Sequence, residues 1–219
     1  MQNVLNIGDV RRPPHHDGYS FSQDWFSHHL PSFERILAQL RPTRLLEIGC
    51  YEGRATTCLI ERCAKFGPVQ IHCIDTWQGS VDLSAEKMSG VEHRFDGNVA
   101  TAITRAGNEV AFRKIKQSSE IALAGLVTER AEPFDLIYVD GSHTAADVLT
   151  DAVLAFQLLR VGGVMIFDDY LWSMEPQHLA DPLNTPKFAI DAFTTAFARR
   201  VRVLPAFPNE QCYVEKIGN

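Results

Sequence analysis

The feature that most constrains the fold is an alternation of short apolar strands with helical segments from residue 44 onward. Strands and helices of this kind, with strands apolar on both faces, are typical of a mostly parallel sheet covered by helices on both sides. We therefore expect an α/β fold. Five strands are predicted, at residues 44–49, 69–75, 110–116, 134–140 and 163–169. Five helices follow them in turn, at residues 54–66, 92–107, 119–130, 144–159 and 186–200.

The C-terminal part departs from this alternation. Residues 201–207 and 210–217 read as two strands separated by a tight turn containing Pro208 and Asn209. A hairpin at this place makes the last strand antiparallel to its neighbours. The sequence therefore predicts a seven-stranded, mostly parallel sheet whose last strand is reversed.

The N-terminal part is predicted to be a helical or lid segment, over residues 1–42. Within it, residues 32–40 repeat apolar side chains at helical spacing, and Ser32 is the expected N-cap. Residues 43–219 form the predicted core, and we expect the whole of residues 1–219 to be a single domain, as its length allows.

Charge and composition restrict the partners. The net charge is −6 at pH 7, so the basic surface that dominates nucleic-acid affinity is not expected. No apolar run approaches the roughly 18 residues that suggest a membrane span, and the first residues lack the apolar stretch of a secretion signal. We expect a cytoplasmic protein with a small-molecule partner, without nucleic acid or membrane; a homo-oligomer is compatible with the sequence. The five cysteines do not form a C-x-x-C pair and are predicted to be reduced thiols.

A glycine turn follows the first strand, in the stretch "LLEIGCYEGRAT". Gly49 and Gly53 allow a sharp bend and a close ligand approach, but the spacing differs from the dinucleotide pattern G-x-G-x-x-G. Glu47 disfavours an anionic ligand and suits an ammonium group. Asp75, at the end of the second strand, is placed to accept hydrogen bonds from ribose hydroxyls. The alternative is a tight turn with structural carboxylates.

Two further strands end on acids, Asp140 in one and Asp168 with Asp169 in the other. Neighbouring parallel strands place their carboxyl ends side by side, so these three side chains are expected to converge. Three crowded carboxylates repel one another unless a divalent cation or a proton is bound. Oxygen ligands favour Mg²⁺, with Mn²⁺ or Ca²⁺ as alternatives, and give no reason to propose zinc. The alternative is that each aspartate caps the following helix or loop.

Together, the glycine turn, the ribose acid and the terminal hairpin resemble the class I S-adenosylmethionine-dependent methyltransferases, from about residue 40 to the end. The motifs "VDGSH" and "FDD" resemble the metal-dependent O-methyltransferases, which include catechol O-methyltransferase and the macrocin-type sugar O-methyltransferases. The resemblance implies a Rossmann-like fold, S-adenosylmethionine as cofactor, and a metal ion, expected to be Mg²⁺, held by Asp140, Asp168 and Asp169. It also implies a cofactor site formed by Glu47, Gly49, Tyr51, Gly53, Asp75, Trp77, Ser118, Ser119 and Asp140.

His143 is the predicted catalytic base, together with Asp140 as a second catalytic residue. It lies three positions beyond Asp140, where the catechol enzymes carry a lysine. Imidazole has an unperturbed pKa of about 6.5 and accepts a proton at neutral pH. The alternative is a loop histidine bonded to the backbone. The other histidines, including His28 and His29, are assigned no chemistry.

The expected reaction is O-methylation of a hydroxylated small molecule such as a catechol or a sugar diol, because two vicinal oxygens chelate a cation well. Residues 77–91 and 170–185 are irregular, and their roles are not predicted. Three alternatives remain open: a metal-independent methyltransferase with His143 as base, a cofactor-binding module without turnover, and a Rossmann-type oxidoreductase.

Overall fold

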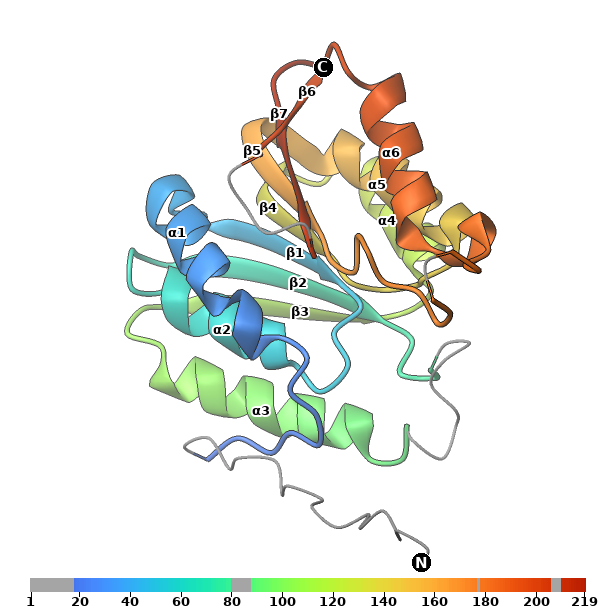
Figure 1. Ribbon diagram of the computed structural model, residues 1–219. Coiled ribbons are helices and arrows are strands. Elements are labelled where there is room, and N and C mark those ends of the chain that lie inside the picture. Colours follow the sequence, from blue (N-terminus) through green and yellow to red (C-terminus); the bar gives the residue numbers. More distant parts are fainter. Residues whose placement is uncertain (1–17, 80–87, 177, 206–209) are drawn as a thin grey trace, which may run out of the picture.

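A seven-stranded sheet in the order β3-β2-β1-β4-β5-β7-β6 forms the centre of the protein (Figure 1). The structure is a computed structural model, and it describes residues 18–79, 88–176, 178–205 and 210–219. Strands β1 to β5 are parallel, and β7 is antiparallel to both β5 and β6. This confirms the predicted fold. The strands are β1 Arg44–Ile48, β2 Val69–Asp75, β3 Val110–Lys116, β4 Phe134–Val139, β5 Leu159–Phe167, β6 Val201–Val203 and β7 Cys212–Lys216.

Helices cover both faces of the sheet (Figure 1). Successive strand residues point to opposite faces, so in β1 Leu45 packs with α1, α2 and α3, whereas Leu46 packs with α4, α5 and α6. Each face thus has its own apolar core. The helices are α1 Leu30–Leu40, α2 Arg54–Cys63, α3 Val91–Arg105, α4 Ser119–Thr128, α5 Ala145–Leu158 and α6 Pro186–Ala196, with short 3-10 turns η1 Ser27–His29 and η2 Pro182–Asn184.

Some predicted boundaries are wrong. Helix α1 begins at Leu30 rather than after Ser32, because η1 runs directly into it and Pro31 occupies its first turn. Strand β5 begins at Leu159, immediately after α5, so that Gly162 and Gly163 lie inside it, and its register with β4 shifts near Phe134. The predicted strand at residues 163–169 therefore begins four residues earlier and ends two residues earlier in the structure.

The five cysteines are free thiols, as predicted, and three of them are buried: Cys50, Cys63 and Cys73. Within the described part of the chain, none of the helices is both long and apolar enough to cross a membrane.

Candidate active site at the carboxyl ends of the strands

The strand order places a ligand site next to β1. Between β1 and its neighbours β2 and β4 the connections run in opposite directions, and such switch points bind ligands in open α/β sheets. The register aligns Ile48 with Ile74 and Val139, and Val139 with Phe167. The residues that follow these positions therefore meet at one edge. A cleft of about 1040 Å³ opens there.

Gly49 is required by the packing at this edge. Its φ is +80°, and a Cβ atom would lie 1.9 Å from the carbonyl oxygen of Asp140. The Asp140 amide donates to Ile48 O at 2.8 Å, which holds the β4 end against the turn. Any side chain at Gly49 would push the glycine turn away from the acid that follows β4.

Asp75 holds the glycine turn through backbone amides. Its Oδ2 accepts from the amides of Cys50 at 2.8 Å and Tyr51 at 2.9 Å, and its Oδ1 accepts from the amide of Trp77 at 2.6 Å. Each carboxylate oxygen has about two acceptor sites, so Oδ1 retains one for a ligand. Asp75 lines the cleft, and its predicted bond to ribose stays a prediction.

Trp77 and Gly53 are absent from the described residues that line the cleft. The Trp77 ring packs on Phe95 with ring centroids 4.8 Å apart, and its indole N–H donates to Tyr51 O at 2.9 Å. Gly53 begins α2 with a φ of +80°, where a Cβ would lie 3.0 Å from the Phe95 ring. Both residues therefore pack against Phe95 and do not line the cleft, whereas Tyr51 does.

Glu47 is a carboxyl group 1% exposed at the edge of the cleft. Burial raises its pKa to about 8; Thr56 and Cys73 oppose this shift, and the charge of Asp75 adds to it. Without a cationic neighbour this carboxyl group is therefore mostly protonated at neutral pH, and a nearby ammonium group would favour its ionised form.

Ser118 and Ser119 line the cleft at the start of α4, beyond the end of β3. Ser118 is the N-cap residue, but its side chain makes no capping hydrogen bond. Ser119 bonds instead to the buried carboxyl of Asp151. Ser118 therefore lines the cleft without capping α4, and its predicted contact with the cofactor stays a prediction.

The predicted acidic cluster is present. One carboxylate oxygen from each of Asp140, Asp168 and Asp169 lies within 4.8 Å of the others. Burial and the charges of Asp168 and Asp169 raise the pKa of Asp140 well above its usual range. The cluster thus carries the mutual repulsion that the sequence predicts for three crowded acids.

Asp168 is held by three side chains. Its oxygens accept from the Tyr138 hydroxyl and from Gln211 Nε2 at 2.9 Å, and His29 Nε2 lies 3.3 Å from Oδ1. Burial alone would raise the pKa of Asp168, but His29, Tyr138 and Gln211 lower it below its usual value. The sequence reading missed these residues. Of the three, only Tyr138 could have been identified from the sequence. It lies two positions before Asp140, so their side chains are expected on the same face of the sheet.

His143 is fixed beside the acidic cluster. Its Nε2 lies 3.0 Å from Asp169 Oδ2, and its ring stacks on Trp172 with centroids 3.9 Å apart. Asp169 has a φ of 56°, a left-handed conformation that aspartate tolerates better than most residues. The predicted base therefore contacts one of the three predicted metal ligands, Asp169.

Solved methyltransferase structures share this fold. TomG, an O-methyltransferase of Streptomyces achromogenes involved in tomaymycin synthesis and solved in complex with SAM, aligns with a TM-score of 0.58 at 15% identity, covering 90% of this chain and 83% of that one. The MycE methyltransferase of the mycinamycin biosynthetic pathway, in complex with Mg, SAH and mycinamycin VI, aligns with a TM-score of 0.56 at 21% identity, covering 90% of this chain and 51% of that one. Similarity at these identities establishes the fold.

Sequence comparison identifies the family. The O-methyltransferase hkm8 of Aspergillus hancockii is 33% identical over 129 residues, which are 59% of this chain and 43% of that protein. The chain thus spans less than half the length of this curated relative. A family model described as a methyltransferase domain matches residues 46–170, more than half of the chain. That range runs from the glycine turn to the acidic cluster, and it argues against a dinucleotide oxidoreductase. The chain therefore belongs to the methyltransferase domain family.

Proposed function

We propose that this protein transfers a methyl group from S-adenosylmethionine to a hydroxyl group of a small molecule, with a divalent cation held by the acidic cluster. The observation that carries the proposal is the direct contact between two half-sites. The glycine turn packs against Asp140 through Gly49, and Asp140 is itself part of the acidic cluster. A methyl donor and an acceptor hydroxyl bound at these two places would be neighbours.

The cleft fits the cofactor in size and in chemistry. Its volume of about 1040 Å³ exceeds what a drug-sized ligand requires. Glu47 and Tyr51 line the end that we assign to the methionine moiety, Asp75 the ribose, and Ser118 and Ser119 the adenine edge. When bound, S-adenosylmethionine supplies an electrophilic methyl group. The residues of the glycine turn would then orient this methyl group toward Asp140.

The acidic cluster fits a hard divalent cation. Its donors are all carboxylate oxygens, which Mg²⁺ prefers. Burial first, and then the charges of Asp168 and Asp169, raise the pKa of Asp140, and a cation would keep all three acids ionised. When bound, such a cation lowers the pKa of a hydroxyl group and fixes its direction. Asp140, Asp168 and Asp169 are the proposed ligands.

His143 is the proposed base. Asp169 Oδ2, 3.0 Å from His143 Nε2, would stabilise the imidazolium that forms when His143 takes the proton of the acceptor hydroxyl. The Trp172 ring restricts rotation of the imidazole by stacking on it. His143 is therefore held at the acceptor end of the cleft by one polar and one aromatic neighbour.

The acceptor end has aromatic walls. Trp25, His143, Leu171 and Trp172 line the cleft there, and the Trp25 ring lies beside Tyr51 with centroids 5.0 Å apart. Flat aromatic surfaces beside a carboxylate cluster suit an acceptor with an apolar face and two adjacent oxygens. A catechol and a sugar diol both have this character.

A second candidate is a methyltransferase that needs no metal. Asp168 already has three partners, Tyr138, Gln211 and His29. Gln211 and His29 both contact its Oδ1, so these contacts are also consistent with a structural role for Asp168. In this alternative His143 alone promotes the transfer. A cofactor-binding module without turnover would lack transfer altogether.

The test is methyl transfer to a panel of catechols and sugar diols, with labelled S-adenosylmethionine as donor. Chelator treatment should abolish transfer, and added Mg²⁺ should restore it. The His143→Ala variant should lose roughly 10²–10⁴-fold in rate with nearly unchanged cofactor affinity, the magnitude expected for a lost general base. Asp168→Asn should lose most of its activity together with its response to Mg²⁺. His93→Ala, an exposed histidine on α3, is the control.

The outcomes separate the candidates. Full activity in chelator together with a slow His143→Ala variant supports the metal-independent enzyme. Binding of S-adenosylmethionine without transfer to any acceptor supports the binding module. If calorimetry detects no binding of S-adenosylmethionine or of its demethylated product, the proposal is wrong.

A further inference from the structure

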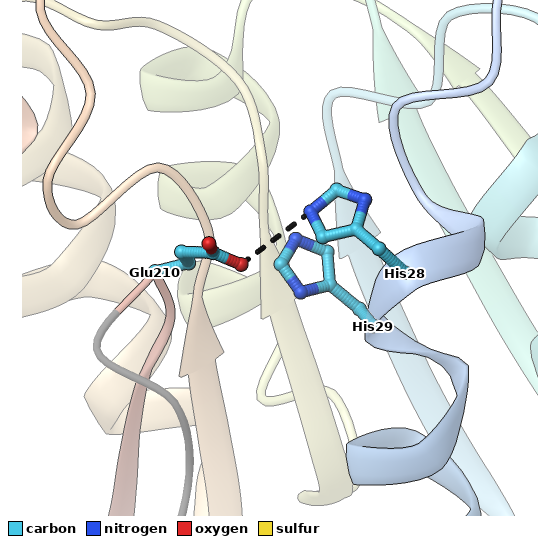
Figure 2. Close-up of side chains that lie close together, drawn as sticks. All are labelled: His28, His29 and Glu210. Atoms are coloured by element: carbon cyan, nitrogen blue, oxygen red, sulfur yellow. Dashed lines mark ion pairs between the residues drawn. The ribbon is translucent and has the colours of Figure 1, made fainter.

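A second group of potential metal ligands lies at the rim of the cleft, outside the acidic cluster. His28 and His29 belong to η1, and Glu210 lies just before β7, so the group joins distant parts of the chain. Figure 2 shows both imidazole rings directed toward the Glu210 carboxylate. One ligand atom from each residue lies within 4.8 Å of the others. The sequence reading assigned these histidines no chemistry.

The spacing of this group is close to that of a coordination sphere. His28 Nε2 lies 3.7 Å from Glu210 Oε2, and ligands of a tetrahedral Zn²⁺ site with bonds of about 2.1 Å are about 3.4 Å apart. The rings of His28 and His29 are adjacent, with centroids 3.7 Å apart. Only small side-chain movements are needed for the three groups to share one ion.

The burial of the three side chains suits capture of an ion from solution. The side chains of His28 and Glu210 are 55% and 65% exposed, so both can adjust and leave positions for water. The His29 side chain is only 6% exposed, because the wall of the cleft surrounds it. The group therefore combines one fixed, buried ligand with two adjustable ligands that are open to solvent.

We propose that His28, His29 and Glu210 form a second cation site, for a divalent cation that prefers nitrogen ligands, such as Zn²⁺. Two imidazoles and one carboxylate are the ligands of many zinc sites, whereas Mg²⁺ favours oxygen alone. The acidic cluster, with its three carboxylates, has the opposite preference. Two sites of different selectivity thus lie side by side, since His29 also contacts Asp168.

An ion at this site ties η1 to the segment before β7. His28, His29 and Glu210 all line the cleft, so the ion would join two parts of its wall. The bound ion should stabilise the folded chain by mass action. This role does not depend on the proposed methyl transfer.

The test is calorimetric titration with Zn²⁺ of the full chain, stripped with chelator and then saturated with Mg²⁺. The unmodified protein should bind one equivalent of Zn²⁺. His28→Ala and Glu210→Gln should each weaken that binding at least about tenfold. His93→Ala should bind as the unmodified protein does, because His93 is an exposed histidine elsewhere, on α3. Asp140→Asn, in the acidic cluster, should also retain it.

A Co²⁺ spectrum separates this site from the buried group Glu47, Cys50 and Cys73. Cobalt bound by His28, His29 and Glu210 should show no thiolate charge-transfer band in the near ultraviolet. Such a band overturns the proposal, as does Zn²⁺ binding that persists unchanged in both His28→Ala and Glu210→Gln. Loss of Zn²⁺ binding in Asp140→Asn overturns it too, because the ion would then occupy the acidic cluster. Thermal unfolding confirms that each variant is folded.

Discussion

At the residue scale, carboxyl groups of the same cleft differ because their surroundings differ. Asp75 receives three backbone amides and is bound to the glycine turn. Glu47 lies buried nearby, and burial together with the charge of Asp75 raises its pKa to about 8. Asp168 has a lowered pKa, because the effects of His29, Tyr138 and Gln211 outweigh its burial. The partners of each acid, more than its position at a strand end, decide its charge.

Binding of S-adenosylmethionine at pH 7 should release a proton from Glu47. A group with a pKa of about 8 is mostly protonated at this pH, and the ammonium of the methionine moiety would lower that pKa by favouring the charged form. The expected release is on the order of one proton. Calorimetry in two buffers of different ionisation enthalpy measures it. The idea fails if Glu47→Gln, which has no proton to release here, shows the same proton count.

At the element scale, the segment before η1 is fastened to α3 and to the glycine turn. The buried side chain of Asn98, on α3, accepts from Ser20 N at 2.8 Å and donates to Ser20 O at 2.9 Å and to Glu52 O at 2.8 Å. Glu52 accepts from Ser22 and pairs with Arg94. Residues of this segment line the cleft, so its attachment fixes one wall. Its predicted role as a lid over an acceptor stays a prediction.

The Asn98→Ala variant should be destabilised by about 1–3 kcal/mol, because the backbone groups of Ser20 and Glu52 lose their partner and the bond to Glu52 O is buried. Limited proteolysis should also cut the chain before η1 faster than in the unmodified protein. The matched control is Thr104→Ala on the exposed side of the same helix, where the hydroxyl bonds only to Ala100 O. Urea unfolding measures both variants, and equal midpoints for the two would contradict this account.

At the scale of the whole molecule, the fold could be predicted because it depends on local pattern. Apolar strands alternate with helices, and the antiparallel β7 was expected because its segment closely follows that of β6 in the sequence. The predicted turn at Pro208 and Asn209 lies outside the described residues. The convergence of Asp140, Asp168 and Asp169 could be predicted as well, since parallel neighbours end at one edge. The contact of His29 with Asp168 could not, because no periodicity relates residues so far apart. The orientation of Trp77, which packs behind the turn, depends on Phe95 and was likewise beyond prediction.

Asp151 links the stability of the whole molecule to pH. It lies on α5 with 1% exposure, and burial raises its pKa to about 7, with Asp147 and Glu120 adding to the shift and a hydrogen bond from Ser119 opposing it. In the unfolded chain its pKa is near the ordinary value of 3.8. Between these two values the folded state binds more protons than the unfolded state. The contribution of Asp151 to stability therefore falls as pH rises through this window.

The Asp151→Asn variant should remove this part of the pH dependence. Below about pH 4 the carboxyl is protonated in both states, so the substitution should matter least there. As the pH rises to 8, the free energy of unfolding of the variant should increase by about 1–4 kcal/mol relative to that of the unmodified protein, because the variant avoids burying an ionised acid. Urea unfolding at intervals from pH 4 to pH 8 measures the difference. Glu129→Gln is the control: its side chain is 61% exposed, and its curve should run parallel to that of the unmodified protein. If the curve of Asp151→Asn also ran parallel to that of the unmodified protein, Asp151 would have the same pKa in the folded and unfolded states. That result would contradict the effect of burial proposed here.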